Sequence, residues 1–440
     1  MRGTRFVADA VLPCDEQMAL YSPGVVDVDA DGQIVWVGAE ADQPHRPHWT
    51  VERHTGLLLP GLINVHCHSP MTLLRGQGEG LPLSTWLTEV IWPREAKLSA
   101  DDVYWGMTLA IAEMLRFGVT TTVEMYFHDE ALAAAVDASG ARCVVTPGVL
   151  VAPGWERFGT WPERIEWIAG LRARYAEHPR IEIGFGPHSA YTLPEEALRK
   201  VGEAARSTGA LVHMHVAESE HEADEVSARH GGASVPALLA DLGLFDDNRV
   251  LAAHAVWLTD TDIALFRQHG VGVAHCPGSN AKLASGTARL TDLLRAGVPV
   301  GLGTDGPASG NDLDMWEEMR LAALFARQRE RDPTVLPAAV ALGLATRGGA
   351  AALGRPDLGV LAPGRQADMI RVDLADPGFV PVLTDADLIA HSVWSAPRQQ
   401  VRDVWVAGRQ LVYDGQCGTI DVAEAARQVQ AAAVRLADGG

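Results

Sequence analysis

The chain alternates short apolar runs with helix-forming stretches, and this alternation limits the folds open to it more than any other feature. Eight apolar runs end near His68, Met125, Val149, His188, Val216, His254, His275 and Asp305. Stretches with a helical pattern separate them, such as residues 105–117, 194–207 and 234–242. Eight successive strand–helix units predict an α/β fold, a (β/α)8 TIM barrel.

The two ends of the chain show a different pattern, rich in short strands. Residues 25–29 and 33–37 are joined through Asp31-Gly32, a strong hairpin signal, and similar runs return at 367–372 and 401–408. Neither end has enough strands to bury a face alone. We therefore expect residues 1–57 and 361–420 to form one composite β-sandwich domain. Residues 58–360 would form the catalytic barrel, and 421–440 a C-terminal helix.

Composition narrows the class of protein further. Hydrophobic residues make up 47% and charged residues 21%, as in a globular protein with a large core. The net charge of −20 argues against electrostatic binding to nucleic acid or to an anionic membrane. The five cysteines are far apart in the sequence, which favours reduced thiols. Without a signal-peptide pattern or an apolar stretch long enough to span a bilayer, a cytoplasmic protein is expected.

Polar residues at the ends of these runs predict a metal site. His66 and His68 are two residues apart at the end of one run, so on a strand they point to the same side. His215 and Asp305 end two other runs, and catalytic residues of a barrel gather at such strand ends. These four residues are the predicted ligands of one divalent metal ion. Zinc suits this donor set best, and Fe²⁺, Ni²⁺ and Mn²⁺ are also compatible with it.

Three residues are predicted to carry out catalysis beside the metal: Glu218, His254 and Asp305. Glu218 follows His215 by three positions and is placed to move a proton from water to a substrate nitrogen and then to a leaving amine. His254 is expected to hydrogen-bond the water or the developing tetrahedral centre. A single histidine near a strand end is more often structural, and His213 is interpreted in this way, as a packing residue or a partner of a ligand. Five such polar residues at strand ends, in order along the chain, favour a catalytic site.

The residues quoted above resemble those of the amidohydrolase superfamily. The similarity rests on the run from Leu59 to His68, on His215-x-x-Glu218, on His254 and on Gly303-Thr304-Asp305-Gly306. It points to the mononuclear-metal branch of deaminases, related to triazine hydrolases and guanine deaminase. Within this branch the chain is most similar to the family that deaminates 5′-methylthioadenosine and S-adenosylhomocysteine. The fourth predicted strand, residues 181–188, lacks the lysine of binuclear members, so the resemblance implies one metal ion.

The resemblance also implies a substrate site. His188 matches a histidine that contacts adenine, Trp86 and Glu95 match residues that bind ribose, and Ser309 matches a pocket serine. A carboxylate such as Glu95 can accept hydrogen bonds from both hydroxyls of a cis-diol. Without the resemblance, Glu95 would be interpreted as a surface carboxylate following Pro93.

The implied activity is metal-dependent hydrolytic deamination of an adenosine-type nucleoside to the inosine analogue and ammonia. The candidates are adenosine, 5′-deoxyadenosine and 5′-methylthioadenosine, with S-adenosylhomocysteine as a further one. One departure bears on this choice, because Pro147 stands where the family usually has an arginine that engages the distal substituent. We therefore expect a preference for less polar 5′ groups. The alternative is that Arg157 or another cation replaces the family arginine.

The sequence is also compatible with three other functions. The first is hydrolysis or deamination of another N-heterocycle, such as a guanine-like base, a pterin or an s-triazine, which has no diol for Glu95 to bind. The second is hydrolysis of a cyclic amide, which releases no ammonia. The third is a barrel without metal that serves as a binding protein. The expected partner is a small-molecule nucleoside, and enzymes of this size commonly form homo-oligomers.

Overall fold

The computed structural model describes residues 3–395 and 398–438. Two four-stranded parallel sheets lie at its centre, in the orders β5-β6-β7-β9 and β11-β12-β13-β14. The first consists of β5 (Leu62–Cys67), β6 (Val119–Glu124), β7 (Arg142–Val145) and β9 (Ile181–Ile183). The second consists of β11 (Leu211–Val216), β12 (Arg249–His254), β13 (Gly272–His275) and β14 (Val300–Leu302). The short strands β8 (Gly148–Val149) and β10 (Gly186–Pro187) form a separate pair.

The eight predicted strands are present in a (β/α)8 arrangement of the TIM-barrel type, but their hydrogen-bonded ladders do not close into a ring. On one side the two sheets meet at a single bridge between Phe185 and Val212. On the other side β5 and β14 form no ladder, but the Asp305 N–H donates to the carbonyl oxygen of His66 (3.1 Å) and the Asn64 side chain bonds Thr304. Its amide nitrogen donates to the Thr304 hydroxyl (2.8 Å), and its oxygen accepts from the Thr304 backbone N–H (3.1 Å). The strands are too short and too interrupted for a continuous ladder around the ring.

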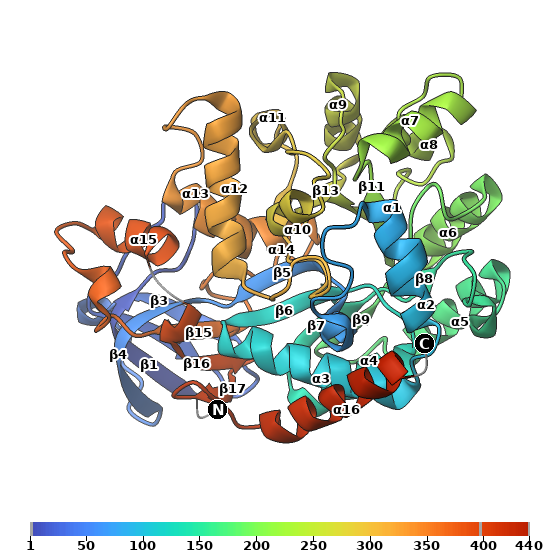
Figure 1. The fold of residues 1–440 in the computed structure, drawn as a ribbon. Coiled ribbons are helices and arrows are strands. Elements are labelled where there is room, and N and C mark those ends of the chain that lie inside the picture. Colours follow the sequence, from blue (N-terminus) through green and yellow to red (C-terminus); the bar gives the residue numbers. More distant parts are fainter. Residues whose placement is uncertain (1–2, 396–397, 439–440) are drawn as a thin grey trace.

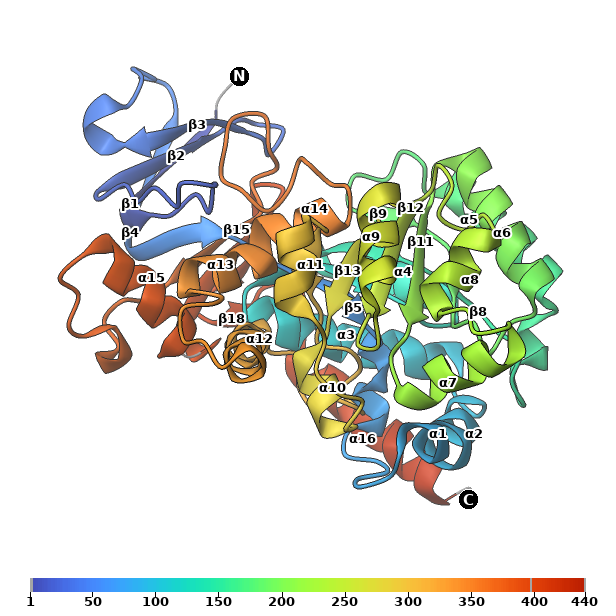
Figure 2. The ribbon, with the colours of Figure 1, turned by 90° about the horizontal axis from the view of Figure 1, so that it is seen from above.

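Helices cover the outer side of these strands, as the sequence predicts (Figures 1 and 2). They are α3 (Ala100–Arg116), α4 (Asp129–Ser139), α5 (Trp161–Arg174), α6 (Glu195–Thr208), α7 (Glu220–Arg229), α8 (Val235–Asp241), α9 (Asp260–His269), α10 (Pro277–Lys282), α11 (Leu290–Ala296), α12 (Met315–Glu330), α13 (Ala338–Gly343) and α14 (Gly349–Ala352). The start of α3 illustrates why they begin where they do. The Ser99 hydroxyl accepts from the Asp102 backbone N–H, and the Asp102 carboxylate accepts from the Ser99 N–H, which satisfies two free donors.

Both ends of the chain enter one eight-stranded sheet, in the order β18-β17-β16-β15-β4-β1-β2-β3. Its strands are β1 (Thr4–Val11), β2 (Gly24–Val28), β3 (Ile34–Ala39), β4 (Thr50–Pro60), β15 (Met369–Val372), β16 (Val401–Val406), β17 (Arg409–Tyr413) and β18 (Gln416–Cys417). The predicted pairing of the two ends is therefore confirmed. A separate β-sandwich is not, because the strands form a single sheet and β4 runs past the expected boundary at residue 57.

Two further helices lie near the end of the chain. Helix α15 (Asp385–Trp394) precedes β16, and α16 (Val422–Asp438) lies along α3 (Figure 1). An ion pair between Arg435 and Asp102 joins α16 to α3. Helix α16 agrees with the predicted C-terminal helix, whose last two residues, 439–440, lie outside the described residues.

Strand β4 leads directly into β5, with only Gly61 between them. A Cβ atom at this glycine would lie 2.1 Å from the Thr120 hydroxyl, so no larger residue fits. The Gly61 N–H donates to the carbonyl oxygen of Asp368, in the segment before β15 (3.0 Å). The strand that bears the two predicted histidine ligands is thus tied to the sheet formed by the chain ends.

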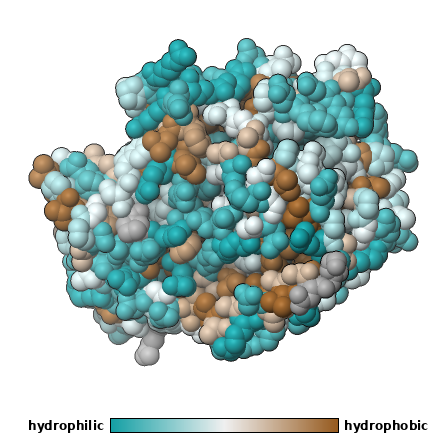
Figure 3. Space-filling model, viewed as in Figure 1, coloured by the Kyte–Doolittle hydropathy of each residue, from teal (hydrophilic) through white to brown (hydrophobic). Residues whose placement is uncertain are grey.

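The surface shown in Figure 3 is largely hydrophilic, with separate hydrophobic areas. Among the described residues, no helix has the length and apolar character needed to cross a membrane.

Candidate active site

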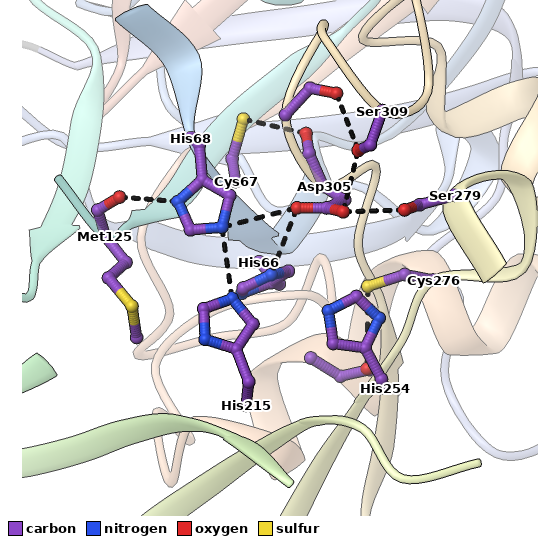
Figure 4. A network of polar contacts seen from close by, with 12 residues as sticks. His66, Cys67, His68, Met125, His215, His254, Cys276, Ser279, Asp305 and Ser309 are labelled. Atoms are coloured by element: carbon purple, nitrogen blue, oxygen red, sulfur yellow. Dashed lines mark hydrogen bonds and ion pairs between the residues drawn. The ribbon is translucent and has the colours of Figure 1, made fainter. Parts of the chain in front are cut away.

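Four histidines and one aspartate converge where the central strands end (Figure 4). His66 and His68 come from the end of β5, His215 from β11, His254 from β12, and Asp305 from the loop after β14. The Nε2 atoms of His68 and His215 are 3.1 Å apart. Asp305 Oδ1 lies 3.3 Å from Nε2 of His66 and 3.3 Å from Nε2 of His68. All the predicted metal ligands are therefore brought together.

Hydrogen bonds fix the tautomers of two of these histidines. His68 Nδ1 lies 2.6 Å from the carbonyl oxygen of Met125, and His215 Nδ1 lies 2.8 Å from the carbonyl oxygen of His188. A carbonyl oxygen only accepts, so both Nδ1 atoms carry the hydrogen. In the neutral rings, each Nε2 therefore carries a lone pair that points toward the other predicted ligands.

His66 is fixed by a chain of buried side chains. The Thr146 hydroxyl donates to the carbonyl oxygen of Glu124 (2.8 Å), so it accepts from His213 Nδ1 (2.9 Å). His213 Nε2 is then an acceptor and receives the hydrogen of His66 Nδ1 (2.7 Å). His66 Nε2 is left buried without a hydrogen-bond partner. The sequence suggested packing or ligand support for His213, and the contacts assign it the second.

Asp305 is held through its other oxygen. Oδ2 accepts from the hydroxyls of Ser279 (2.6 Å) and Ser309 (2.7 Å), which leaves Oδ1 facing His66 and His68. Ser309 was expected to line the substrate pocket. Ser309 instead donates its hydrogen bond to Asp305, and it is not among the residues that line the cavity next to these ligands.

The donor set fits a divalent cation. Burial lowers the pKa of His66 to about 3, and it also lowers the pKa of His68 and His215, so the rings are neutral at physiological pH. Imidazole lone pairs and a carboxylate oxygen at these separations repel one another unless a cation lies among them. Neutral imidazoles with one carboxylate are a common zinc ligand set.

The backbone is strained at two of the strand ends that build the site. His254 has a φ of 69° and Asp305 a φ of 59°, both in the left-handed region that non-glycine residues rarely adopt. Such conformations persist where surrounding contacts hold them, and they concentrate at functional sites. For His254 one contact is the hydrogen bond from Nδ1 to Asn280 Oδ1 (2.8 Å).

A cavity opens above these ligands. Its wall includes six of the seven predicted catalytic and substrate-binding residues, namely Trp86, Glu95, His188, Glu218, His254 and Asp305. Burial raises the pKa of Glu218, which makes its carboxyl group a better proton acceptor and donor for a reacting group. Its Oε2 lies 3.9 Å from Nε2 of His254.

The predicted substrate residues line the cavity in a buried setting. Glu95 is only 3% exposed, which excludes the alternative of a surface carboxylate, and burial raises its pKa to about 7. The Trp86 indole N–H donates to the carbonyl oxygen of Gln77 (3.1 Å), which fixes the ring in the wall. Burial lowers the pKa of His188 to about 3, so it meets a substrate as a neutral ring.

Sequence reasoning missed several residues of the site. Ser279 and Asn280 lie four and five residues after His275, and their position shortly after a predicted strand is the only sequence signal for them. Tyr126 and Trp155 also line the cavity. The sequence does carry a signal for both, since Trp155 belongs to the aromatic-rich stretch 153–161 and Tyr126 to a Met-Tyr-Phe-His segment that recurs in the family the chain resembles.

Comparison with known proteins agrees with this geometry. A profile of the amidohydrolase family matches residues 57–411. The chain belongs to the amidohydrolase family. A 5-methylthioadenosine/S-adenosylhomocysteine deaminase from Pelotomaculum thermopropionicum is 41% identical over 432 residues, covering 97% of each chain. A 5′-deoxyadenosine deaminase from Methanosarcina mazei is 41% identical over 97% of this chain and 96% of its own.

The fold has a close match among solved structures. A zinc-bound adenosine deaminase from Xanthomonas campestris superposes with a TM-score of 0.93 at 36% identity, covering 99% of each chain. The predicted resemblance to the mononuclear-metal deaminases is therefore confirmed.

Proposed function

We propose that this amidohydrolase is a metal-dependent deaminase that converts adenosine-type nucleosides to their inosine analogues and ammonia. One observation supports this most directly. The Nε2 atoms of the histidines, each with its Nδ1 hydrogen already donated, face Asp305 Oδ1 at the floor of a cavity that also exposes Glu218 and His188. The names of the relatives agree with this chemistry.

The ligands of the metal would be His66, His68, His215 and Asp305. A divalent metal, zinc first, supplies Lewis acidity that lowers the pKa of water toward ~7. Glu218 takes one proton from the attacking water and delivers it to N1 of adenine as the water oxygen bonds to C6. It then takes the remaining proton of that hydroxyl and passes it to the amine, so that the C6–N bond breaks and ammonia leaves. Nε2 of His254 is an acceptor, since its Nδ1 hydrogen goes to Asn280, and it orients the water beside Glu218.

The cavity wall also bears on the 5′ substituent. Among the described residues, no arginine or lysine lines this cavity. Arg157, the candidate replacement for the family arginine, donates to the carbonyl oxygens of Glu95 (3.2 Å) and Leu98 (2.8 Å) and stacks over Phe158. Its guanidinium is therefore engaged away from the substrate. We propose a preference for uncharged 5′ groups over the amino-acid group of S-adenosylhomocysteine.

The test is ammonia release by the zinc-loaded protein from a panel of substrates. The panel contains adenosine, 5′-deoxyadenosine, 5′-methylthioadenosine, S-adenosylhomocysteine, adenine, guanine and melamine. We expect turnover of the nucleosides, with S-adenosylhomocysteine the slowest of them. Activity on free bases or triazines alone would contradict the nucleoside assignment while keeping the metal chemistry.

Glu218→Gln is the matched variant for this assay. It retains the shape of the side chain and the four metal ligands, so it should bind zinc as the wild type does. General acid–base catalysis contributes roughly 10²–10⁴-fold, and we expect a loss of that size in kcat. Wild-type turnover by this variant would remove Glu218 from the mechanism.

A further inference from the structure

Three buried polar atoms in the cavity wall make no hydrogen bond of good geometry within the protein, although the Tyr126 hydroxyl and the Glu95 carboxylate are close enough to interact with each other. They are Oε1 of Glu95, the hydroxyl oxygen of Tyr126 and the indole Nε1 of Trp155. All three residues line the cavity above the metal ligands. Buried polar groups are almost always paired, and each exception calls for an explanation. A ligand in the cavity that hydrogen-bonds all three atoms would explain why they lack well-formed hydrogen bonds within the protein.

The three atoms differ in whether they donate or accept hydrogen bonds. An ionised carboxylate only accepts hydrogen bonds, an indole N–H only donates, and a phenol does both. Burial raises the pKa of Tyr126 well above its usual range, so this hydroxyl keeps its proton. Each alcohol hydroxyl donates one hydrogen bond and accepts two. The set therefore matches neighbouring alcohol hydroxyls, which need acceptors and donors together.

The wall that presents these atoms is held by its own contacts. The Tyr126 ring stacks on Phe127 with centroids 4.2 Å apart, and Phe127 meets the Trp155 ring edge to face at 4.8 Å. The carbonyl oxygen of Tyr126 accepts from the Gly148 N–H (2.8 Å). The polar atoms thus stand in place before a ligand arrives, which reduces the entropy lost on binding.

We propose that Tyr126 and Trp155, together with Glu95, bind the sugar hydroxyls of the substrate and determine its specificity. This inference rests on the proposed nucleoside substrate. Glu95 accepts from a sugar hydroxyl, Trp155 donates to a sugar oxygen, and the Tyr126 hydroxyl pairs with the hydroxyl that faces it. The sugar, and not the base alone, then decides which compounds are turned over.

The experiment removes a hydroxyl from the enzyme and from the substrate in turn. Wild type and Tyr126→Phe, both zinc-loaded, are assayed for kcat/KM with adenosine, 2′-deoxyadenosine and 3′-deoxyadenosine. A neutral hydrogen bond contributes modestly, so we expect the variant to lose roughly 2- to 10-fold with adenosine. With the deoxynucleoside that lacks the partner hydroxyl, the same substitution should change kcat/KM little. An equal loss on all three substrates, or no loss on adenosine, would overturn the proposal.

Tyr413→Phe is the control, because Tyr413 is exposed on β17 and far from the cavity lining. It should behave as the wild type does on every substrate. If Tyr126→Phe does not fold, Trp155→Phe, which removes the indole N–H, takes its place in the same assay. A loss in kcat/KM with adenosine that shrinks with one of the deoxynucleosides would support the proposal, and an equal loss on all three substrates or no loss on adenosine would overturn it. A wild type that deaminates no nucleoside would instead refute the proposed function.

Discussion

His213 offers the sharpest test of how the metal site is held. It is fully buried, and its Nε2 is the acceptor for the Nδ1 hydrogen of His66, at 2.7 Å. His213→Leu keeps a side chain of similar volume and removes that acceptor. The buried N–H of His66 then lacks a partner, which costs about 1–3 kcal/mol. The hydrogen that fixed the ring also becomes free to move to Nε2, the atom that must bind the metal.

The expected consequence is a weaker zinc complex. Partners of metal-binding histidines typically change metal affinity by about 10- to 100-fold, which corresponds to roughly 1.4–2.8 kcal/mol. We expect a loss in this range for His213→Leu, measured as the zinc dissociation constant in competition with a chelator. His213→Gln, which retains an acceptor and a donor, should recover part of it.

Thermal unfolding of both variants in excess chelator separates this effect from general destabilisation. A His213→Leu protein that binds zinc as tightly as the wild type would refute the reasoning. The tautomer of His66 would then be set by something other than the chain through His213 to Thr146.

Two further predictions concern the carboxylates of the site. Ser279→Ala and Ser309→Ala each remove one hydrogen bond to Asp305 and should each weaken zinc binding by about 2- to 10-fold in the same competition assay. The double variant should lose more than the two singles combined, because Oδ2 is then left without a donor; wild-type affinity in the double variant would contradict this. Burial raises the pKa of Glu222 from 4.5 to about 8, so at neutral pH its carboxyl is protonated in the folded protein and ionised in the unfolded chain. Its contribution to stability is complete below about pH 4.5 and is lost as the pH rises through about 8. Glu222→Gln keeps an acceptor for the Glu218 N–H, so its gain in Tm over the wild type should grow between pH 5 and 8, and a constant difference would refute the reasoning.

The proposed metal ligands could be predicted from the sequence because they stand where three strands end, with His66 and His68 sharing the end of β5. His66, His215 and Asp305 are separated by many residues, yet parallel strands with helical crossovers bring their ends to one edge. Periodicity within a strand then determines the side to which each histidine points. Both signals are local, and the structure agrees with them.

The partners of these ligands could not be predicted in the same way. The contacts of His213 with His66 and Thr146 join positions 147 and 67 residues apart. They depend on where neighbouring strands lie to within a few tenths of an ångström, and the periodicity of the sequence does not define these positions. Whether the strands close into a ring could not be predicted either, for a related reason. Strand number can be counted in the sequence, whereas the ladder between β14 and β5 depends on how Asn64 and Thr304 meet.

The single-residue connection at Gly61 limits the insertions that the sequence can accept between β4 and β5. Strand β4 belongs to the sheet of the chain ends, and five residues after Gly61 comes His66. One inserted residue here would turn both histidine side chains of β5 to the opposite face, because side chains alternate along a strand. The loops after the other strands can lengthen without this effect. Variation among relatives should therefore collect in those loops, while the spacing from β4 to His68 stays constant in length.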